Sequence, residues 1–176
     1  MFKINRIIIL IFIFTFMFLG CAVLGPNSIM EKSYQADMDQ IRIRDVHYIA
    51  SLVEKYYNIK GYYPFGDGIH PLPVNASLTN SKKYMRPGFI MKAEFDKELK
   101  LVLGEETIIP KDPQKIHPYG PRLYQYYTDG ENYTVSAYLF ESTPFTKSLR
   151  KYSHKYQVGS KENLELKIYR YKDIIK

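Results

Sequence analysis

A long helical stripe of apolar residues in the N-terminal half is the feature that most constrains how this chain can fold. Its members recur at spacings of three or four residues, the repeat of one helix face. They are Met38, Ile41, Ile49, Leu52, Tyr56 and Ile59, with Asp45 in the same row and Val46 and Val53 beside it. No Gly or Pro interrupts the segment before Gly61. The pattern predicts a helix from an N-cap at Ser33 to Ile59, whose apolar face needs a sheet to pack against.

A second, shorter helix is predicted over Lys92–Leu103. Its apolar positions on one face are Phe95, Leu99 and Val102. Gly104 follows, where a C-cap glycine is typical. Residues 60–80 hold several Gly and Pro residues and are expected to form a loop.

The clearest β signal is a hairpin. Leu123–Thr128 and Asn132–Phe140 are rich in tyrosine and β-branched residues, and Asp129-Gly130-Glu131 separates them. One face of the second strand is expected to pack on the long helix, and it carries Tyr133, Val135, Ala137 and Leu139. Leu164–Tyr171 alternates and predicts a further strand, whereas residues 143–159 show no clear pattern. Together these elements predict an α+β fold.

The N-terminus has the form of a secretory signal. Lys3 and Arg6 precede the apolar run Ile7–Leu19, and Gly20-Cys21 follows. The run is shorter than the roughly 20 residues that a membrane-spanning helix needs. Cys21 is the only cysteine of the 176 residues, which excludes an internal disulfide.

Phe18-Leu19-Gly20-Cys21 resembles the lipobox of bacterial lipoproteins. The resemblance implies transfer of a diacylglyceryl group to the Cys21 sulfur, cleavage after Gly20 and acylation of the new amino terminus, so the membrane is a partner through the lipid anchor. The alternative is an uncleaved anchor in which the cysteine falls by chance. If the lipobox interpretation holds, residues 1–20 are a signal peptide, residues 21–32 a lipidated tether and residues 33–176 the folded domain. Since Ala22 rather than Asp follows, the outer membrane, facing the periplasm, is favoured in a Gram-negative cell.

The folded part resembles type IV pilin-like proteins, and the major pseudopilins of type II secretion in particular. The first matching residues lie at the end of the long helix and are Asp45-Val46, Ile49, Leu52, Tyr56, Gly61 and Tyr63-Pro64. The others are Ile109-Pro110-Lys111-Asp112-Pro113, Tyr119-Gly120, Tyr124, Tyr126, Asp129-Gly130, Tyr133, Val135, Ala137 and Leu139. The resemblance implies one long N-terminal helix packed on a small antiparallel sheet. On physical grounds we also expect the tyrosine side chains to fill the interface between helix and sheet with their hydroxyls in water.

Two departures from that family bear on function. The chain lacks the prepilin peptidase site and the acidic C-terminal loop that binds calcium in the major pseudopilins. Cleavage before Cys21 would also remove the apolar segment that builds a pilus. The sequence therefore predicts a lipid-anchored module of the cell envelope that contacts an unknown envelope protein, with a link to a secretion or pilus system, and does not build filaments.

The sequence offers no catalytic, cofactor-binding or metal-ligating constellation, and we expect no enzyme and no cofactor. The histidines are His47, His70, His117 and His154, and none has a partner at the spacing of a helical metal motif. No serine lies in a nucleophile elbow, and lipid would occupy Cys21. His47 is expected on the helix surface, and Asp37, Asp39 and Asp45 on a solvated face. The net charge of +7 is scattered, which argues against nucleic acid as a partner.

One alternative function remains open on sequence grounds. The tyrosine pairs Tyr56-Tyr57, Tyr62-Tyr63 and Tyr126-Tyr127 could stack on sugar rings, which would make the domain a binding module for cell-wall glycan or another surface ligand. Packing in the core and at its rim is the expectation we prefer, since neighbouring residues of a strand point to opposite faces. The basic segment 147–155 is expected to be a solvated loop.

Overall fold

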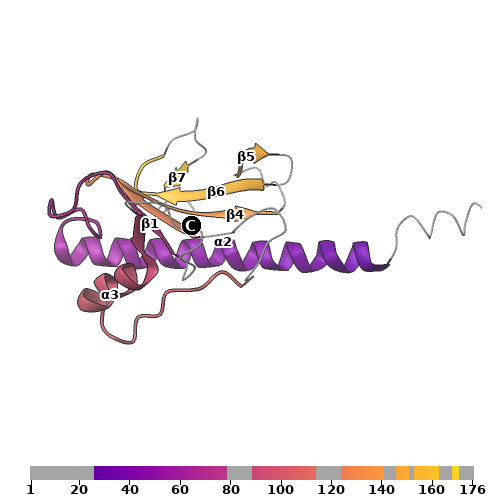
Figure 1. Ribbon diagram of the computed structural model, residues 1–176, viewed down its shortest axis with the longest axis horizontal. Coiled ribbons are helices and arrows are strands. Elements are labelled where there is room, and N and C mark those ends of the chain that lie inside the picture. Colours follow the sequence, from indigo (N-terminus) through magenta and orange to yellow (C-terminus); the bar gives the residue numbers. More distant parts are fainter. Residues whose placement is uncertain are drawn as a thin grey trace, which may run out of the picture. The chain divides into compact units, whose positions relative to one another are not determined.

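The computed structural model describes residues 26–78, 89–113, 124–140, 146–150, 153–162 and 168–170. These residues form an α+β fold of two helices and a mixed sheet (Figure 1). The chain divides into two units, Met1–Asp37 and Met38–Lys176, and the sheet belongs to the second. The predicted signal peptide and Cys21 lie outside the described residues.

Helix α2 comprises Pro26–Lys60 and is longer than predicted. The predicted start at Ser33 is wrong, because part of the segment expected as a tether is helical. Proline is compatible with the first helical position, where a backbone N–H would have no partner inside the helix. The predicted end is confirmed: the N–H of Gly61 donates to the Tyr57 carbonyl at 2.7 Å, and Gly61 has a φ of 79°.

The strands form one sheet in the order β2-β1-β3-β4-β6-β5, and β7 also pairs with β6. Their bounds are β1 Val74–Ser77, β2 Phe89–Met91, β3 Gln125–Thr128, β4 Tyr133–Leu139, β5 Thr146–Arg150, β6 Ser153–Gly159 and β7 Ile168–Arg170. The β1–β2 and β6–β7 pairs are parallel, and the other pairs are antiparallel. The β3–β4 hairpin confirms its prediction, whereas the expectation of a purely antiparallel sheet is wrong.

Four strands escaped prediction because none of them alternates over more than a few residues. β1 lies in the segment expected as a loop, and three of its four residues are buried. β2 has three residues, all half-buried. β5 and β6 occupy the segment that showed no clear pattern. β7 lies within the predicted strand Leu164–Tyr171, whose other residues are outside the described part.

Strand β6 has different partners along its two sides. One side pairs with β4 from His154 to Gly159. The other side is shared, since β5 pairs with its first half and β7 with its second half. Gly159 lies where β6 passes close to β4: a Cβ atom there would lie 2.2 Å from the Tyr133 carbonyl oxygen.

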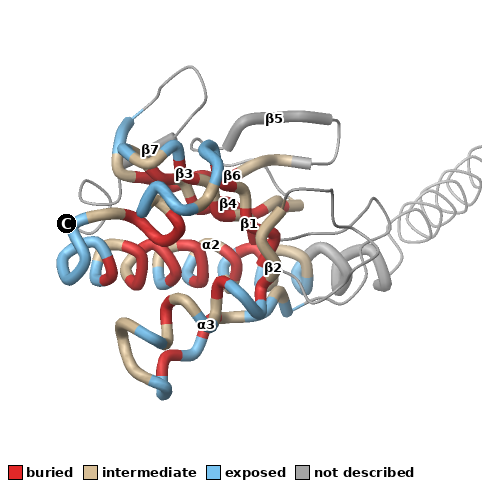
Figure 2. Tube along the Cα trace, turned by 60° about the vertical axis from the view of Figure 1, so that its left-hand side comes forward, coloured by how far each residue is buried: buried red, intermediate tan, exposed pale blue. Residues whose placement is uncertain are grey.

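The core lies between α2, α3 and the sheet (Figure 2). From α2 it takes Val46, Ile49, Ala50, Leu52, Val53 and Tyr56, and from β4 it takes Tyr133, Val135, Ala137 and Leu139. Both sets contain the residues predicted to face each other. The predicted stripe is wrong at Ile59, which is 62% exposed, and Met38 and Ile41 at its other end are only half-buried. Helix α3, Lys92–Leu103, matches its prediction and buries Phe95 and Leu99; the N–H of Gly104 donates to the Lys100 carbonyl.

Candidate functional site

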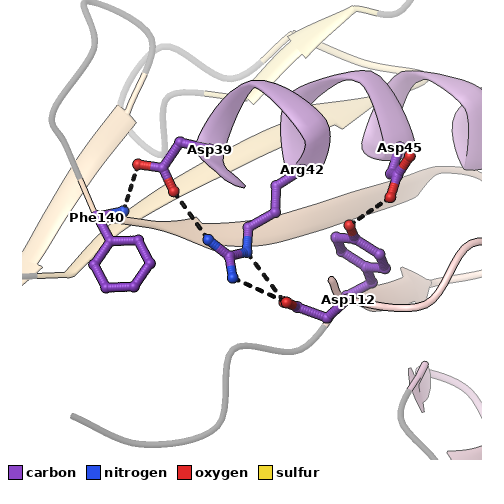
Figure 3. A network of polar contacts seen from close by, with 6 residues as sticks. Asp39, Arg42, Asp45, Asp112 and Phe140 are labelled. Atoms are coloured by element: carbon purple, nitrogen blue, oxygen red, sulfur yellow. Dashed lines mark hydrogen bonds and ion pairs between the residues drawn. The ribbon is translucent and has the colours of Figure 1, made fainter. Parts of the chain in front are cut away.

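The structure brings together a buried polar network on the first half of α2 (Figure 3). Arg42 is fully buried at its centre. Its Nε donates to Oδ2 of Asp112 at 3.1 Å and its Nη2 donates to Oδ1 at 2.9 Å, so the contact is bidentate. Its Nη1 donates to Oδ1 of Asp39 at 3.1 Å. The guanidinium also lies 5.3 Å from the centre of the Phe140 ring.

Asp39 links this network to the sheet. Its Oδ2 accepts the backbone N–H of Phe140, the residue after β4, at 2.6 Å. The Asp39 carboxylate therefore contacts the guanidinium of Arg42 on its own helix and also accepts a backbone N–H from the end of a strand. Burial lowers the pKa of Arg42, but the hydrogen bonds and charges of Asp112 and Asp39 outweigh burial and raise it. Arg42 is thus a permanent cation inside the domain.

Asp45 extends the network toward the hairpin. Its Oδ2 accepts the hydroxyl of Tyr124 at 2.7 Å, and both side chains are buried. Burial raises the pKa of Asp45, although the hydroxyl of Tyr124 and the charge of Arg44 oppose that rise. Burial and the adjacent carboxylate raise the pKa of the Tyr124 hydroxyl well above its ordinary value.

The prediction of a solvated acidic face on α2 is wrong for two of its three members. Asp37 is exposed, but Asp39 and Asp45 are buried. The physical reason is the compensation that Arg42, Tyr124 and the Phe140 amide supply, without which buried carboxylates would be costly. A signal was present in the sequence, because Asp39, Arg42 and Asp45 continue the three-residue spacing of the apolar stripe.

Three core tyrosines donate to carboxylates carried by helices. Tyr124 donates to Asp45, Tyr133 donates to Oε1 of Glu54 at 3.0 Å, and Tyr56 donates to Glu98 of α3. The hydroxyl of a fourth, Tyr126, donates to the Pro64 carbonyl at 3.0 Å. The expectation that these hydroxyls are left in water is therefore wrong. These hydroxyls link α2 to α3, to the β3–β4 hairpin and its entry, and link β3 to the loop after α2, by polar contacts as well as by packing.

Lys92, the first residue of α3, is a second buried cation. Its Nζ lies 2.6 Å from both carboxylate oxygens of Asp96 and donates to the Ile109 carbonyl at 3.4 Å. Burial lowers the pKa of Lys92, although the carboxylate of Asp96 opposes this. Sequence reasoning missed this residue.

The histidines are spread over the molecule. His47 is half-buried rather than on the surface: its Nε2 lies 2.7 Å from the hydroxyl oxygen of Tyr156 on β6, and burial lowers its pKa. Nδ1 of His70 lies 3.7 Å from Oδ1 of Asp67. His154 is half-buried on β6, and His117 is outside the described residues. Among the residues that the structure describes, no three His, Cys, Asp or Glu residues are grouped to hold a metal ion.

Each of the three tyrosine pairs has one buried member, as the packing prediction requires. Tyr56, Tyr63 and Tyr126 are buried, whereas Tyr62 and Tyr127 are half-buried. Tyr57 is 39% exposed and stacks on Tyr63 with ring centres 4.5 Å apart. The basic segment is not a loop throughout, since residues 146–150 and 153–159 are strands.

Four exposed aliphatic side chains belong to the last turns of the two helices or to the segments that follow them. Ile59 belongs to the last turn of α2, and Ile69, 81% exposed, belongs to the loop after it. Leu101 belongs to the last turn of α3, and Ile108, 75% exposed, follows that helix. Such residues are normal when isolated and mark a contact site where they are contiguous.

Comparisons with known proteins found no matching family model, no matching curated protein and no matching solved structure. Within the described residues, no helix is long and apolar enough to cross a membrane.

Proposed function

We propose that this protein is a non-enzymatic lipoprotein of the cell envelope whose pilin-like domain works through protein–protein contacts. The anchor rests on the resemblance of residues 18–21 to a lipobox. The pilin-like character is supported by a long helix that ends at Gly61 and packs its apolar half on a tyrosine-rich hairpin. An outer-membrane location and a link with a secretion or pilus system are further parts of the proposal.

The observation that carries the proposal is the contrast between polar and aliphatic side chains. Arg42, Asp39, Asp45 and Lys92 are buried, and each is paired with another group of the domain. The aliphatic residues Ile59, Ile69, Leu101 and Ile108 are instead exposed. Exposed aliphatic side chains suit an apolar partner surface better than they suit a polar small molecule.

The anchor is tested by metabolic labelling of the full-length protein with palmitate in a bacterial host. Wild type should take up label and enter the membrane fraction, and Cys21→Ser should do neither. Ser28→Ala, which lies just beyond the cleavage site, is the matched control and should behave as wild type. Equal labelling of wild type and Cys21→Ser would contradict the lipoprotein proposal.

Protein contact is tested by placing a photo-crosslinking amino acid at Ile69 or Ile108 in cells. Both positions should give a discrete crosslinked species, whereas the same amino acid at exposed Lys97 should not. An Ile108→Asp change should weaken a complex that forms through that residue. Absence of crosslinks from both isoleucines would contradict a protein partner at this surface.

Filament formation provides a separate test of the departure from pilus building. A chain that begins at Ala22 lacks the apolar segment that a pilin keeps, so it should remain a monomer or a small closed oligomer in light scattering. Regular filaments in electron microscopy at high concentration would contradict this part of the proposal.

The second candidate is a glycan-binding module, which the exposed face of Tyr57 favours because stacked aromatic rings suit sugar rings. In that case purified cell-wall glycan should sediment the protein, and Tyr57→Ala should abolish the effect. Ile69→Ala should not reduce it. If the Tyr57→Ala variant still sediments with the glycan, stacking on that ring is ruled out.

A further inference from the structure

The segment after α3, residues 105–113, has neither helix nor strand and connects α3 with Arg42 of α2 (Figures 1 and 3). We call it the strap. We propose that the strap opens from the domain as one unit while α2 and the β3–β4 hairpin stay folded, and that the Arg42–Asp112 contact is the latch that holds it closed.

Within the described part of the chain, the only backbone–backbone hydrogen bond of the strap is a local one. The N–H of Thr107 donates to the Gly104 carbonyl at 3.1 Å. No backbone–backbone hydrogen bond between described residues joins the strap to α2 or to the sheet. Segments held by side chains rather than by a backbone ladder belong to the low-stability end of a structure, where local opening occurs.

Contacts at Ile109 and Asp112 hold the strap at separate points, and Thr107 of the strap is also buried. Ile109 is buried in the core, and its carbonyl accepts the distant Nζ of Lys92. Asp112 receives two hydrogen bonds from Arg42. Ile108 and Lys111, which flank Ile109 and Asp112, are exposed. The strap therefore has one apolar anchor and one ionic anchor, and the ionic anchor is at the end farther from α3.

When the strap opens, the Arg42 side of the latch stays with the body of the domain. Arg42 retains its contact with Asp39, and its guanidinium retains the Phe140 ring. The Asp112 carboxylate passes into water, where it is fully solvated. Both sides of the latch therefore have a partner in the open state, which makes opening a transition of the strap alone.

Opening changes the surface that the domain presents. It uncovers a guanidinium and the apolar site that Ile109 fills, two features that the closed domain hides. The strap is thus a conformational device that exposes a guanidinium, still paired with Asp39, and an apolar site. This inference does not depend on the lipid anchor or on the pilin-like resemblance.

The test is hydrogen exchange of the full-length protein in detergent, comparing wild type with Asp112→Asn. Loss of the charged latch should raise exchange of the Thr107 amide, the strap N–H whose hydrogen bond the structure shows, on the order of 100-fold, the effect of breaking a buried ion pair. Exchange in β3 and β4 should not change. Trypsin cleavage after Lys111 should accelerate in parallel.

Two further variants make the test decisive. Glu105→Gln also removes a carboxylate from the strap, but this residue is exposed and should leave exchange unchanged. Arg42→Lys keeps the charge without the two-point contact and should give a smaller rise than Asp112→Asn. An unchanged strap in Asp112→Asn would overturn the proposal. Equal rises in the strap and in β4 would also overturn it, because they would mean that the domain unfolds as a whole.

Discussion

The buried face of α2 has two parts with opposite chemistry. From Asp39 to Asp45 the helix buries two carboxylates and a guanidinium, whereas from Val46 to Tyr56 it buries aliphatic and aromatic side chains. Both parts follow the same helical spacing and face the same domain. The comparison teaches that the helical repeat determines which positions are buried, while the partners on other segments determine which chemistry those positions can carry.

The two parts also stabilise the domain in different ways. Apolar burial contributes about 25 cal/mol per Å² and needs no particular geometry. The polar part depends on pairing, since a buried charge that loses its partner keeps its desolvation cost. Truncation should therefore remove a graded amount of stability from the apolar part, and a large amount from the polar part wherever a charge is left alone.

The largest effect is expected for Arg42→Met. The change leaves Asp39 and Asp112 without their shared cation, so the free energy of unfolding should fall by about 3–5 kcal/mol. Urea denaturation of the purified protein measures it. A loss below about 1 kcal/mol would mean that methionine fills the site as well as the ion network does, as replacement of whole buried ion clusters can.

A loss of about 2–5 kcal/mol is expected for Leu52→Ala in the apolar part, since it empties a buried site. Ile59→Ala is the matched control on the same helix. Ile59 is exposed, so its replacement should stay within about 0.5 kcal/mol of wild type. Similar losses from both variants would show that the buried stripe extends farther along α2.

High pH should destabilise the domain through the buried tyrosines of both parts. Burial raises the pKa of Tyr56, Tyr124 and Tyr126, so the folded state holds their protons while an unfolded tyrosine releases its proton near pH 10. Below about pH 10 the protonated tyrosines contribute their whole stabilising effect. Above it, the free energy of unfolding should fall by about 1.4 kcal/mol per pH unit for each buried tyrosine. Urea denaturation at several alkaline pH values measures the slope. Tyr126→Phe should reduce it by one tyrosine's share.

The smallest effect is expected for Asp45→Asn in the polar part. The amide oxygen can still accept the Tyr124 hydroxyl, and the desolvation that raises the pKa of Asp45 is removed, so stability at pH 7 should change by less than about 1 kcal/mol. As pH falls toward about 4, folded wild type takes up a proton before unfolded wild type does. Wild type should therefore gain stability relative to the variant over that range. Denaturation at both pH values checks the sign.

Much of the fold could be predicted because its signals are local. The apolar repeat of α2 and α3, Gly61, Gly104 and the β3–β4 hairpin are written in short stretches of sequence. Strands β1, β2, β5 and β6 could not be predicted, because their stability comes from neighbours far along the chain. The Arg42 network was missed for the same reason: Asp112 and Phe140 lie 70 and 98 positions further on. Cys21 stays a prediction.

Gly159 limits how this sequence can diverge. Many surface positions of the domain can change freely, but any side chain at Gly159 would collide with the backbone of β4, which cannot move without breaking the strand pair. Substitutions there should be eliminated by selection even where the surrounding residues have drifted beyond recognition. A distant relative of this protein should therefore keep a glycine at the end of the strand that pairs with its tyrosine hairpin. The position of that glycine after the hairpin offers a way to recognise such a relative.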